Sequence, residues 1–357
     1  MKIIHCSDLH LDSALRSNLS QEKAKLRGAE LCAAFGRLIA FAKREQVDAV
    51  LIAGDLFDSP YTSRQTADYV LETIRSAPQI HFFYLRGNHD EKRNILSEHK
   101  LPDNLKTFDS RWRSYCCAQV VITAIEPEGS GWLTMYDSLQ LDENRMNIVM
   151  LHGQTAAQPG EEKIALPLLR GKHIRYLALG HLHGYSKTPL DMDGECCYSG
   201  CLEGRGFDEC GEKGFILLET DGNRFKSRFV PFSKRMLHEI FVDISGAETV
   251  SEILARLKYA SSGIAPEDLV KFVLTGTYTL QTQKDLCFLQ RMLEPDFWFV
   301  KIKDESRLKI EEKNFAGDIS LKGAFIRSVL SSDRGEDEKM CIIECGIRAL
   351  NGEEVLL

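Results

Sequence analysis

The chain contains 357 residues, of which 43% are hydrophobic and 27% charged, and its formal net charge is −7 at pH 7. This length exceeds what one hydrophobic core usually organises, so two domains are expected. No run of eighteen apolar residues exists, which argues against a transmembrane helix, and the N-terminus turns polar too soon for a signal peptide.

The first ninety residues alternate between strand-like and helix-like patterns. Strands are predicted at 2–6, 48–53 and 81–85. Helices are predicted between them, at about 25–46 and 63–76, with Ser63 as an N-cap. This βαβαβ order favours a parallel sheet with right-handed crossovers.

The middle of the chain is richer in strand patterns. Residues 119–125 and 132–136 are predicted to form a hairpin. Further strands are expected at 147–151, 176–180, 196–199, 214–219 and 225–231, with a turn at 221–223. Two packed sheets with outer helices would accommodate this number of strands.

The pattern restarts after residue 235. Strands at 238–244, 269–275 and 297–303 alternate with helices at about 249–260 and 283–293, which indicates a small α+β domain. One or two short helices are expected within 323–357. We therefore expect three parts, with boundaries at 1–235, 236–320 and 321–357.

Cysteine usage and charge add two expectations. The eleven cysteines include no CxxC pair, so free thiols in the cytoplasm are the simplest interpretation. Residues 236–357 carry −6 of the net charge, whereas nucleic-acid binding usually needs a basic face. The basic stretches 170–175 and 224–228 could supply one locally, although such runs are more often solvated surface.

Metal-ligand side chains directly follow several of the predicted strands. The segments are Asp8-Leu9-His10, Gly54-Asp55, Gly87-Asn88-His89-Asp90, His152 and Gly180-His181-Leu182-His183. Open α/β sheets build their sites at the carboxyl ends of strands, so we expect these side chains to meet. Each segment alone is commonly a turn or a surface histidine, and the repetition is what predicts a site.

The residue types indicate two divalent cations. Asp8 and His10 are two residues apart, and in extended backbone that spacing sends both side chains to one face. Asp, His and Asn donors suit manganese, iron or zinc. Asp55 could bridge two cations, which would then hold a phosphate and a hydroxide, as two-metal hydrolysis requires.

A proton donor for the leaving group is also expected. His89 lies beside the ligand candidate Asn88, so it can reach the site without being a ligand. Asp90 is expected to hold the tautomer of His89 and keep the ring cationic. Asp12 and Asp58 lie near the motifs, where they could support the site or cap the backbone.

Together these motifs resemble the calcineurin-like metallophosphoesterase superfamily. Residues 7–13, 198–209 and 213–215 further resemble the nuclease subunits of SbcCD-type DNA double-strand-break repair complexes, including YhaO-like exonucleases. The resemblance implies a four-layer α/β sandwich with a small α+β capping domain. It also implies a site for two divalent metal ions, with Mn²⁺ as the expected metal. It implies this ligand distribution: Asp8, His10 and His183 for one ion, Asn88, His152 and His181 for the other, and Asp55 between them.

The resemblance also implies an activity and partners. His89, backed by Asp90, would protonate the leaving oxygen during hydrolysis of DNA, as a 3′–5′ exonuclease and single-strand endonuclease. A homodimer and an SbcC-like SMC-type ATPase are the implied partners, and no membrane is implied. A phosphatase or small-molecule phosphodiesterase stays open as an alternative, as does a scaffold that docks an ATPase.

Overall fold

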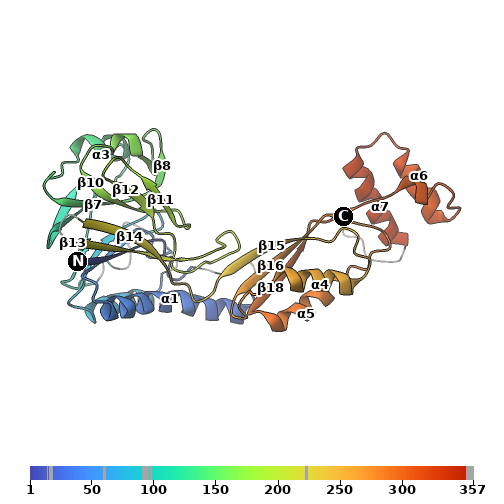
Figure 1. Cartoon of the computed structure of the whole chain (residues 1–357), viewed down its shortest axis with the longest axis horizontal. Helices are drawn as coiled ribbons and strands as arrows, with labels where there is room; N and C mark the ends of the chain where they lie inside the picture. Colours follow the sequence, from blue (N-terminus) through green and yellow to red (C-terminus); the bar gives the residue numbers. More distant parts are fainter. Residues whose placement is uncertain are drawn as a thin grey trace. The chain divides into compact units, whose positions relative to one another are not determined.

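The computed structural model of the chain describes residues 1–13, 15, 19–58, 62–90, 96, 99–221 and 224–350, without the side chains of Glu312 and Asp337 (Figure 1). Its contacts divide the chain into two compact units, Met1–Met236 and Leu237–Leu357. The division into three domains, with boundaries at residues 235 and 320, stays a prediction. Among the described residues, no helix combines the length and the apolar character needed to cross a membrane.

The first unit contains a six-stranded sheet with the order β14-β13-β1-β2-β3-β4. Its parallel strands are β1 (Lys2–Cys6), β2 (Ala49–Ala53), β3 (His81–Leu85) and β4 (Leu105–Thr107). The hairpin of β13 (Gly214–Asp221) and β14 (Arg224–Pro231) adds to β1 in antiparallel orientation. The strands lie close to their predicted positions, whereas the turn expected at 221–223 falls mostly outside the described residues.

A second six-stranded sheet has the order β11-β12-β10-β7-β6-β5. Its parallel strands are β6 (Val120–Ala124), β7 (Met146–His152), β10 (Ile174–Gly180) and β12 (Glu195–Tyr198). The outer strands β5 (Arg113–Cys117) and β11 (Ser186–Pro189) pair antiparallel to their neighbours. A small ladder of β8 (Gln154–Ala156) and β9 (Lys163–Ala165) lies outside this sheet.

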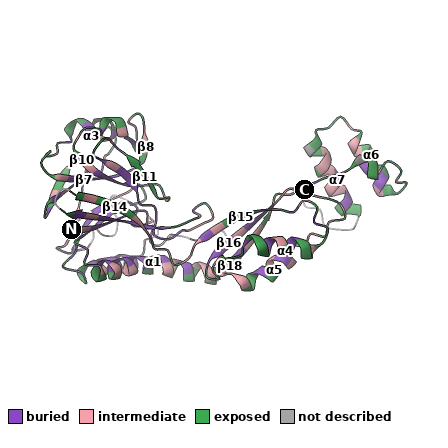
Figure 2. Cartoon of the chain, in the orientation of Figure 1, coloured by how far each residue is buried: buried purple, intermediate pink, exposed green. Residues whose placement is uncertain are grey.

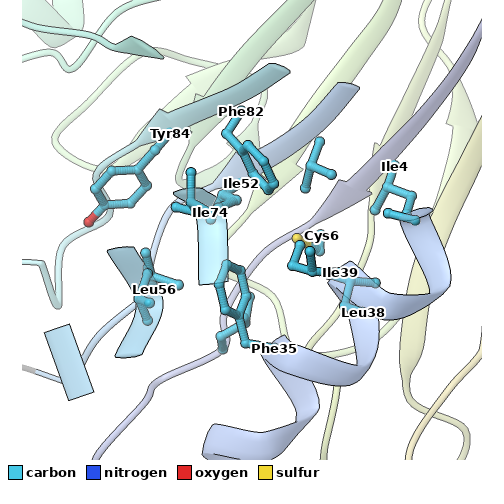
Figure 3. Close-up of a cluster of buried hydrophobic side chains, with 14 of the residues drawn as sticks. Ile4, Cys6, Phe35, Leu38, Ile39, Ile52, Leu56, Ile74, Phe82 and Tyr84 are labelled. Atoms are coloured by element: carbon cyan, nitrogen blue, oxygen red, sulfur yellow. The ribbon is translucent and has the colours of Figure 1, made fainter. Parts of the chain in front are cut away.

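Three apolar clusters hold these sheets and their helices together. One cluster lies between the first sheet and the helices α1 (Gln21–Arg44) and α2 (Arg64–Arg75), and it includes Phe35 and Leu38 of α1 with Ile52 and Phe82 of the sheet (Figure 3). Helix α1 buries one stripe of side chains and exposes the opposite face (Figure 2). A second cluster fills the space between the two sheets, and a third lies beneath α3 (Gly131–Ser138) on the second sheet. The predicted four-layer α/β sandwich is confirmed.

The hairpin predicted from 119–125 and 132–136 is wrong in its second half. Residues 132–136 belong to α3, and β6 pairs instead with β5. Trp132, Met135 and Tyr136 are buried, while Leu133 is 55% exposed. The second and third of these buried residues follow the first by three and four positions, which is the spacing of one face of a helix. Tertiary packing therefore outweighs the strand preference of Trp, Thr and Tyr.

The second unit contains a parallel three-stranded sheet, β15-β16-β18. Its strands are β15 (Leu237–Asp243), β16 (Leu269–Thr275) and β18 (Phe299–Asp304), and the helices α4 (Val250–Ala260) and α5 (Leu286–Leu293) share their apolar core. Thr249 and Glu252 form a reciprocal capping box at the start of α4. A short ladder of β17 (Thr277–Tyr278) and β19 (Arg307–Leu308) leads to α6 (Leu321–Leu330) and α7 (Glu336–Leu350), which share a small cluster around Ile326 and Ile343.

Candidate metal centre

The candidate ligands lie at the carboxyl ends of five parallel strands in the two sheets. Asp8 and His10 follow β1, Asp55 follows β2, Asn88 follows β3, His152 ends β7, and His181 and His183 follow β10. The first two loops are joined by backbone hydrogen bonds: Asp8 N–H donates to Gly54 O at 3.0 Å, and His10 N–H to Asp55 O at 3.0 Å. The sandwich therefore brings residues from distant parts of the sequence to one edge.

Asp8, His10 and His183 form one compact group of donors. The Nε2 atoms of His10 and His183 are 3.2 Å apart, and His183 Nε2 lies 4.0 Å from Asp8 Oδ1. One ligand atom from each of the three residues lies within 4.8 Å of the others. Such a set could hold one cation.

Asp55 connects this group to a second one. Its Oδ2 lies 3.6 Å from His10 Nε2 and 3.3 Å from His152 Nε2, while its Oδ1 accepts the backbone N–H of His89 at 2.9 Å. His152 Nε2 lies 2.9 Å from Asn88 Oδ1. One carboxylate oxygen thus faces both groups, which is the position that a bridging ligand needs.

His181 is less tightly gathered than the other candidates. Its ring centroid lies 5.5 Å from that of His152, with the rings perpendicular, and its backbone N–H donates to Asp8 Oδ1 at 2.9 Å. It is in none of the three close groups of donors found among the described residues, which are Asp8, His10 and His183; Asp8, Asp55 and His152; and His10, Asp58 and His89.

Left-handed backbone, rather than extended backbone, directs the ligands inward. The φ angles are 54° at Asp8, 44° at His10, 51° at Asp55 and 107° at His181. Each such angle costs a non-glycine residue about 1–3 kcal/mol and is typical of functional sites. The extended geometry expected for the Asp8-x-His10 pair is therefore wrong, although both side chains do reach the same site.

Two motif glycines give the site its close packing. A Cβ atom at Gly54 would lie 2.1 Å from His152 Nδ1, and one at Gly87 would lie 2.1 Å from Asp55 Oδ1. Any side chain at either position would displace a candidate ligand. Gly54 also has a φ of 95°, which favours glycine.

Electrostatics in the site balance two buried carboxylates against imidazoles. Burial alone would raise the pKa of Asp55, but hydrogen bonding to His152 and the charges of His152 and His10 lower it below its usual range. Burial opposes the charged form of His152, yet Asp55 and then Asp8 raise its pKa to about 9. Burial and the charge of Arg205 lower the pKa of His10 to about 3, so this ring is uncharged and can offer a lone pair to a metal ion.

The donor set fits two divalent cations. Asp8 and Asp55 are 1% and 2% exposed, and buried carboxylates require a positive partner. Nitrogen and carboxylate oxygen atoms that can bind metal converge on both sides of Asp55. On one of these sides, His152 Nδ1 lies 3.0 Å from the carbonyl oxygen of Ala53. That carbonyl accepts a hydrogen bond from Nδ1, so Nε2 is directed at the site.

The partner expected for His89 is different in the structure. The Asp90 carboxylate accepts the backbone N–H groups of Phe57 and Gly87, each at 3.0 Å, and so joins the loops after β2 and β3. His89 Nδ1 instead lies 2.9 Å from Asp58 Oδ1. The predicted contact between His89 and Asp90 is therefore wrong, because the buried backbone donors engage Asp90.

A cleft of about 400 Å³ opens beside Asn88 and His152. Trp132 contributes to its wall, and Arg86 lies in it bound to Glu126, with Arg86 Nε donating at 2.7 Å. Its other carboxylates are Asp90, Glu128, Glu161 and Glu162. Sequence reasoning finds Asn88, Asp90 and His152 but not the rest of this cleft, because its remaining wall comes from separate loops that carry no motif.

Comparison with known proteins identifies the family. A family model described as calcineurin-like phosphoesterase matches residues 1–185, which is more than half of the chain. The chain belongs to this family. Its fold uses divalent metal ions, in agreement with the clustered Asp and His side chains, and the superfamily inferred from the motifs is confirmed.

Three curated relatives cover much of the chain. An uncharacterized metallophosphoesterase YhaO from Bacillus subtilis is 24% identical over 343 residues, which are 86% of this chain and 82% of that protein. The SbcD subunit of the nuclease SbcCD from Staphylococcus saprophyticus is 24% identical over 272 residues, covering 65% of this chain and 69% of the relative. The DNA double-strand break repair protein Mre11 from Methanosarcina acetivorans is 25% identical over 252 residues, covering 65% and 39%.

Proposed function

We propose that this calcineurin-like phosphoesterase is a nuclease that hydrolyses DNA phosphodiester bonds with two Mn²⁺ ions. The observation that carries the proposal is the position of Asp55 Oδ2, 3.6 Å from His10 Nε2 and 3.3 Å from His152 Nε2. A carboxylate shared between two donor groups suits a pair of cations, and paired cations are the usual means of cleaving phosphate esters. The similarity to a nuclease subunit and to a DNA repair protein supports DNA as the substrate.

The proposed ligand assignment divides the donors about Asp55. Asp8, His10 and His183 would bind one ion, and Asn88, His152 and His181 the other. Bound there, the two ions would supply a hydroxide nucleophile and positive charge for the scissile phosphate. The chain itself holds the ligands in place, through the Gly54 and Ala53 carbonyls that bind Asp8 and His152.

His89 is the proposed proton donor to the leaving oxygen. Its side chain is 47% exposed, and its ring centroid lies 4.8 Å from that of His10, at the edge of the donor groups. Because Nδ1 pairs with Asp58, Nε2 is the atom left to face substrate. A proton carried on Nε2 would be delivered to the leaving oxygen, which is the role of a general acid.

The partners implied by the relatives belong to the same proposal. We propose that the chain acts as a homodimer with an SMC-like ATPase, in the manner expected for the nuclease subunit of an SbcCD-type complex. Exonuclease action from the 3′ end and endonuclease action on single strands are the modes to be tested.

The cleft favours a second candidate, a phosphodiesterase for small esters. Four of its carboxylates, Glu126, Glu128, Glu161 and Glu162, would oppose the several phosphates of a long DNA strand. A substrate with a single phosphate next to an uncharged group would meet less repulsion. The two functions therefore need to be separated by experiment.

The experiment compares end-labelled single- and double-stranded DNA with bis(p-nitrophenyl) phosphate, each in Mn²⁺. Asp55→Asn should abolish hydrolysis of both, because both depend on the metals. His89→Ala should abolish DNA cleavage and largely spare the nitrophenyl ester, whose leaving group departs without a proton. Asp137→Asn, at an exposed position on α3, is the control. Turnover of the small ester by the wild type without any DNA cleavage would favour the second candidate.

A further inference from the structure

A segment beyond the family match, Cys201–Lys213, packs against one of the candidate ligands. The match ends at residue 185. The Lys213 ammonium donates to the carbonyl oxygen of His183 at 2.9 Å, and the Cys201 N–H donates to the same oxygen at 3.3 Å. The main chain of His183 is therefore held from outside the matched part of the chain.

The same segment supplies a carboxylate to the His183 ring. Glu209 Oε1 lies 2.7 Å from His183 Nδ1, and Glu209 is only 6% exposed. Arg205 fixes this carboxylate from the other side: its backbone N–H donates to Oε2 at 2.8 Å, and its Nε and Nη2 donate to Oε1 at 3.2 and 3.0 Å. Glu209 is thus held in a single orientation.

The hydrogen-bond pattern determines which nitrogen of His183 carries the proton. Both oxygens of Glu209 already accept hydrogen bonds from Arg205, so the carboxylate acts as an acceptor toward His183 as well. Arg205 Nη2 also lies 3.2 Å from His183 Nδ1, but a guanidinium only donates, so both groups direct their hydrogens to Oε1. Nδ1 is therefore protonated, and the lone pair of Nε2 faces His10 and Asp8.

We propose that Glu209 is a positioning residue that presents His183 Nε2 to the metal bound by Asp8, His10 and His183. The inference rests on the proposed two-metal function and assigns one part of it to a residue outside the family match. The other metal would not depend on Glu209, because His152 is oriented by the carbonyl of Ala53, at 3.0 Å from its Nδ1. Loss of Glu209 should therefore affect one metal and spare the other.

The decisive substitution is Glu209→Leu, which removes both carboxylate oxygens and keeps a side chain of similar length. Without a carboxylate to accept from it, the Arg205 guanidinium would donate to His183 Nδ1, which lies 3.2 Å from its Nη2. The ring would then accept at Nδ1 and carry its proton on Nε2, where a metal should bind. We expect Mn²⁺ titration of the metal-free full-length chain, followed by calorimetry, to show one of two sites weakened about 10- to 100-fold. Asp208→Asn, which removes the neighbouring exposed carboxylate, should leave both sites unchanged.

Two further measurements separate positioning from a structural role. In a His183→Asn background, Glu209→Leu should cause no additional loss of Mn²⁺ affinity, because the ring on which it acts is gone. An additive loss, or an unfolding free energy that falls while both Mn²⁺ affinities stay unchanged, would overturn the proposal.

The tautomer itself can be read without any metal. Nitrogen-15 NMR of the His183 ring should show Nδ1 protonated in the wild type and Nε2 protonated in Glu209→Leu; the same tautomer in both would overturn the proposal. This result is independent of DNA cleavage. A wild type that binds two Mn²⁺ ions but cuts no DNA would contradict the proposed function and leave the role of Glu209 standing.

Discussion

Asp58 Oδ1 lies 2.9 Å from Nδ1 of His89, so the partner of the proposed proton donor comes from the loop after β2. The same Asp58 oxygen is 3.7 Å from His10 Nδ1. Asp90, the sequence neighbour of His89, is 5% exposed and accepts backbone N–H groups from both loops instead. Asp58 is thus placed to orient His89, and Asp90 to hold the two loops together.

Removal of the Asp58 charge should harm only reactions that need a proton donor. We expect Asp58→Asn to lower kcat for DNA cleavage by about 10²-fold, the lower end of what general acid catalysis contributes. Turnover of bis(p-nitrophenyl) phosphate should change little, because its leaving group needs no proton. Steady-state kinetics on both substrates test this, with Asp137→Asn as the control. An equal loss on both substrates would mean that Asp58 acts on the metals rather than on His89.

Sequence reasoning predicts the strands that carry the site because buried parallel strands are continuous apolar runs. The runs at 147–151 and 176–180 predict strands, and they lie within β7 and β10. A ligand directly after such a run must lie at the carboxyl edge of the sheet, whatever the intervening loops do. The amino-acid sequence alone is therefore sufficient to identify the candidate metal ligands.

The contacts between loops cannot be predicted in the same way. Asp58 and His89 are 31 residues apart, and Glu209 and His183 are 26 apart, so no local spacing indicates either pair. The adjacent Asp90 is the natural choice for His89 in sequence, but its buried position gives it other donors. Helix α3 escapes prediction for a different reason, since its apolar positions include residues that favour strands.

Metal binding should stabilise the chain through its buried carboxylates. Wild-type protein at a Mn²⁺ concentration of 100 times Kd should gain about 2.7 kcal/mol of unfolding free energy for each bound ion. Asp8→Asn should lose most of the gain from the ion that Asp8 binds, yet be at least as stable as the wild type in EDTA. The reason is that Asp8 is 1% exposed and burial raises its pKa, so its charge is costly without a cation. Urea unfolding in EDTA and in Mn²⁺ measures both effects. Equal Mn²⁺ stabilisation of both proteins would exclude Asp8 as a ligand.

Charge in the cleft should limit activity on long DNA. Glu161 is an exposed wall residue of the cleft beside Asn88. We expect Glu161→Gln to raise kcat/KM on an oligonucleotide roughly 2- to 5-fold at low salt, because one repulsion of up to about 1 kcal/mol is removed, and the gain should vanish at high salt. Glu143→Gln, which changes an exposed carboxylate away from the cleft lining, is the matched control. No change in the oligonucleotide kinetics at any salt concentration would mean that DNA does not pass this wall.

The stability of the chain should depend on a cluster of buried ion pairs around Glu203. Glu203 is 3% exposed and accepts Arg27 Nη2 at 2.8 Å and the backbone N–H of Lys234 at 2.8 Å. Arg27 is 1% exposed, so Glu203→Gln would leave a buried guanidinium with less compensation. We expect a loss of about 3–5 kcal/mol in unfolding free energy, measured in urea, against an unchanged Glu143→Gln protein. A loss below about 1 kcal/mol would show that Glu30, which also binds Arg27, is sufficient as its partner.

His5 should make stability fall as the pH becomes acidic. The ring is 0% exposed between the sheets, with Nδ1 2.8 Å from the Tyr176 hydroxyl, and burial lowers its pKa from 6.5 to about 3. Between these two pKa values the unfolded chain binds a proton at His5 that the folded chain does not. The contribution of the buried, neutral His5 ring to the unfolding free energy is therefore present above pH 6.5 and is lost progressively toward pH 3.

The slope from one such group approaches about 1.4 kcal/mol per pH unit. His5→Gln keeps a polar partner for Tyr176 but cannot titrate. Between pH 7.5 and 5, we expect the wild type to lose about 2 kcal/mol more unfolding free energy than this variant. Urea titrations in EDTA at both pH values measure the difference, and His173→Gln, at an exposed position, should behave as the wild type. The same loss in the His5→Gln protein would show that other groups, such as His10, account for the acid sensitivity.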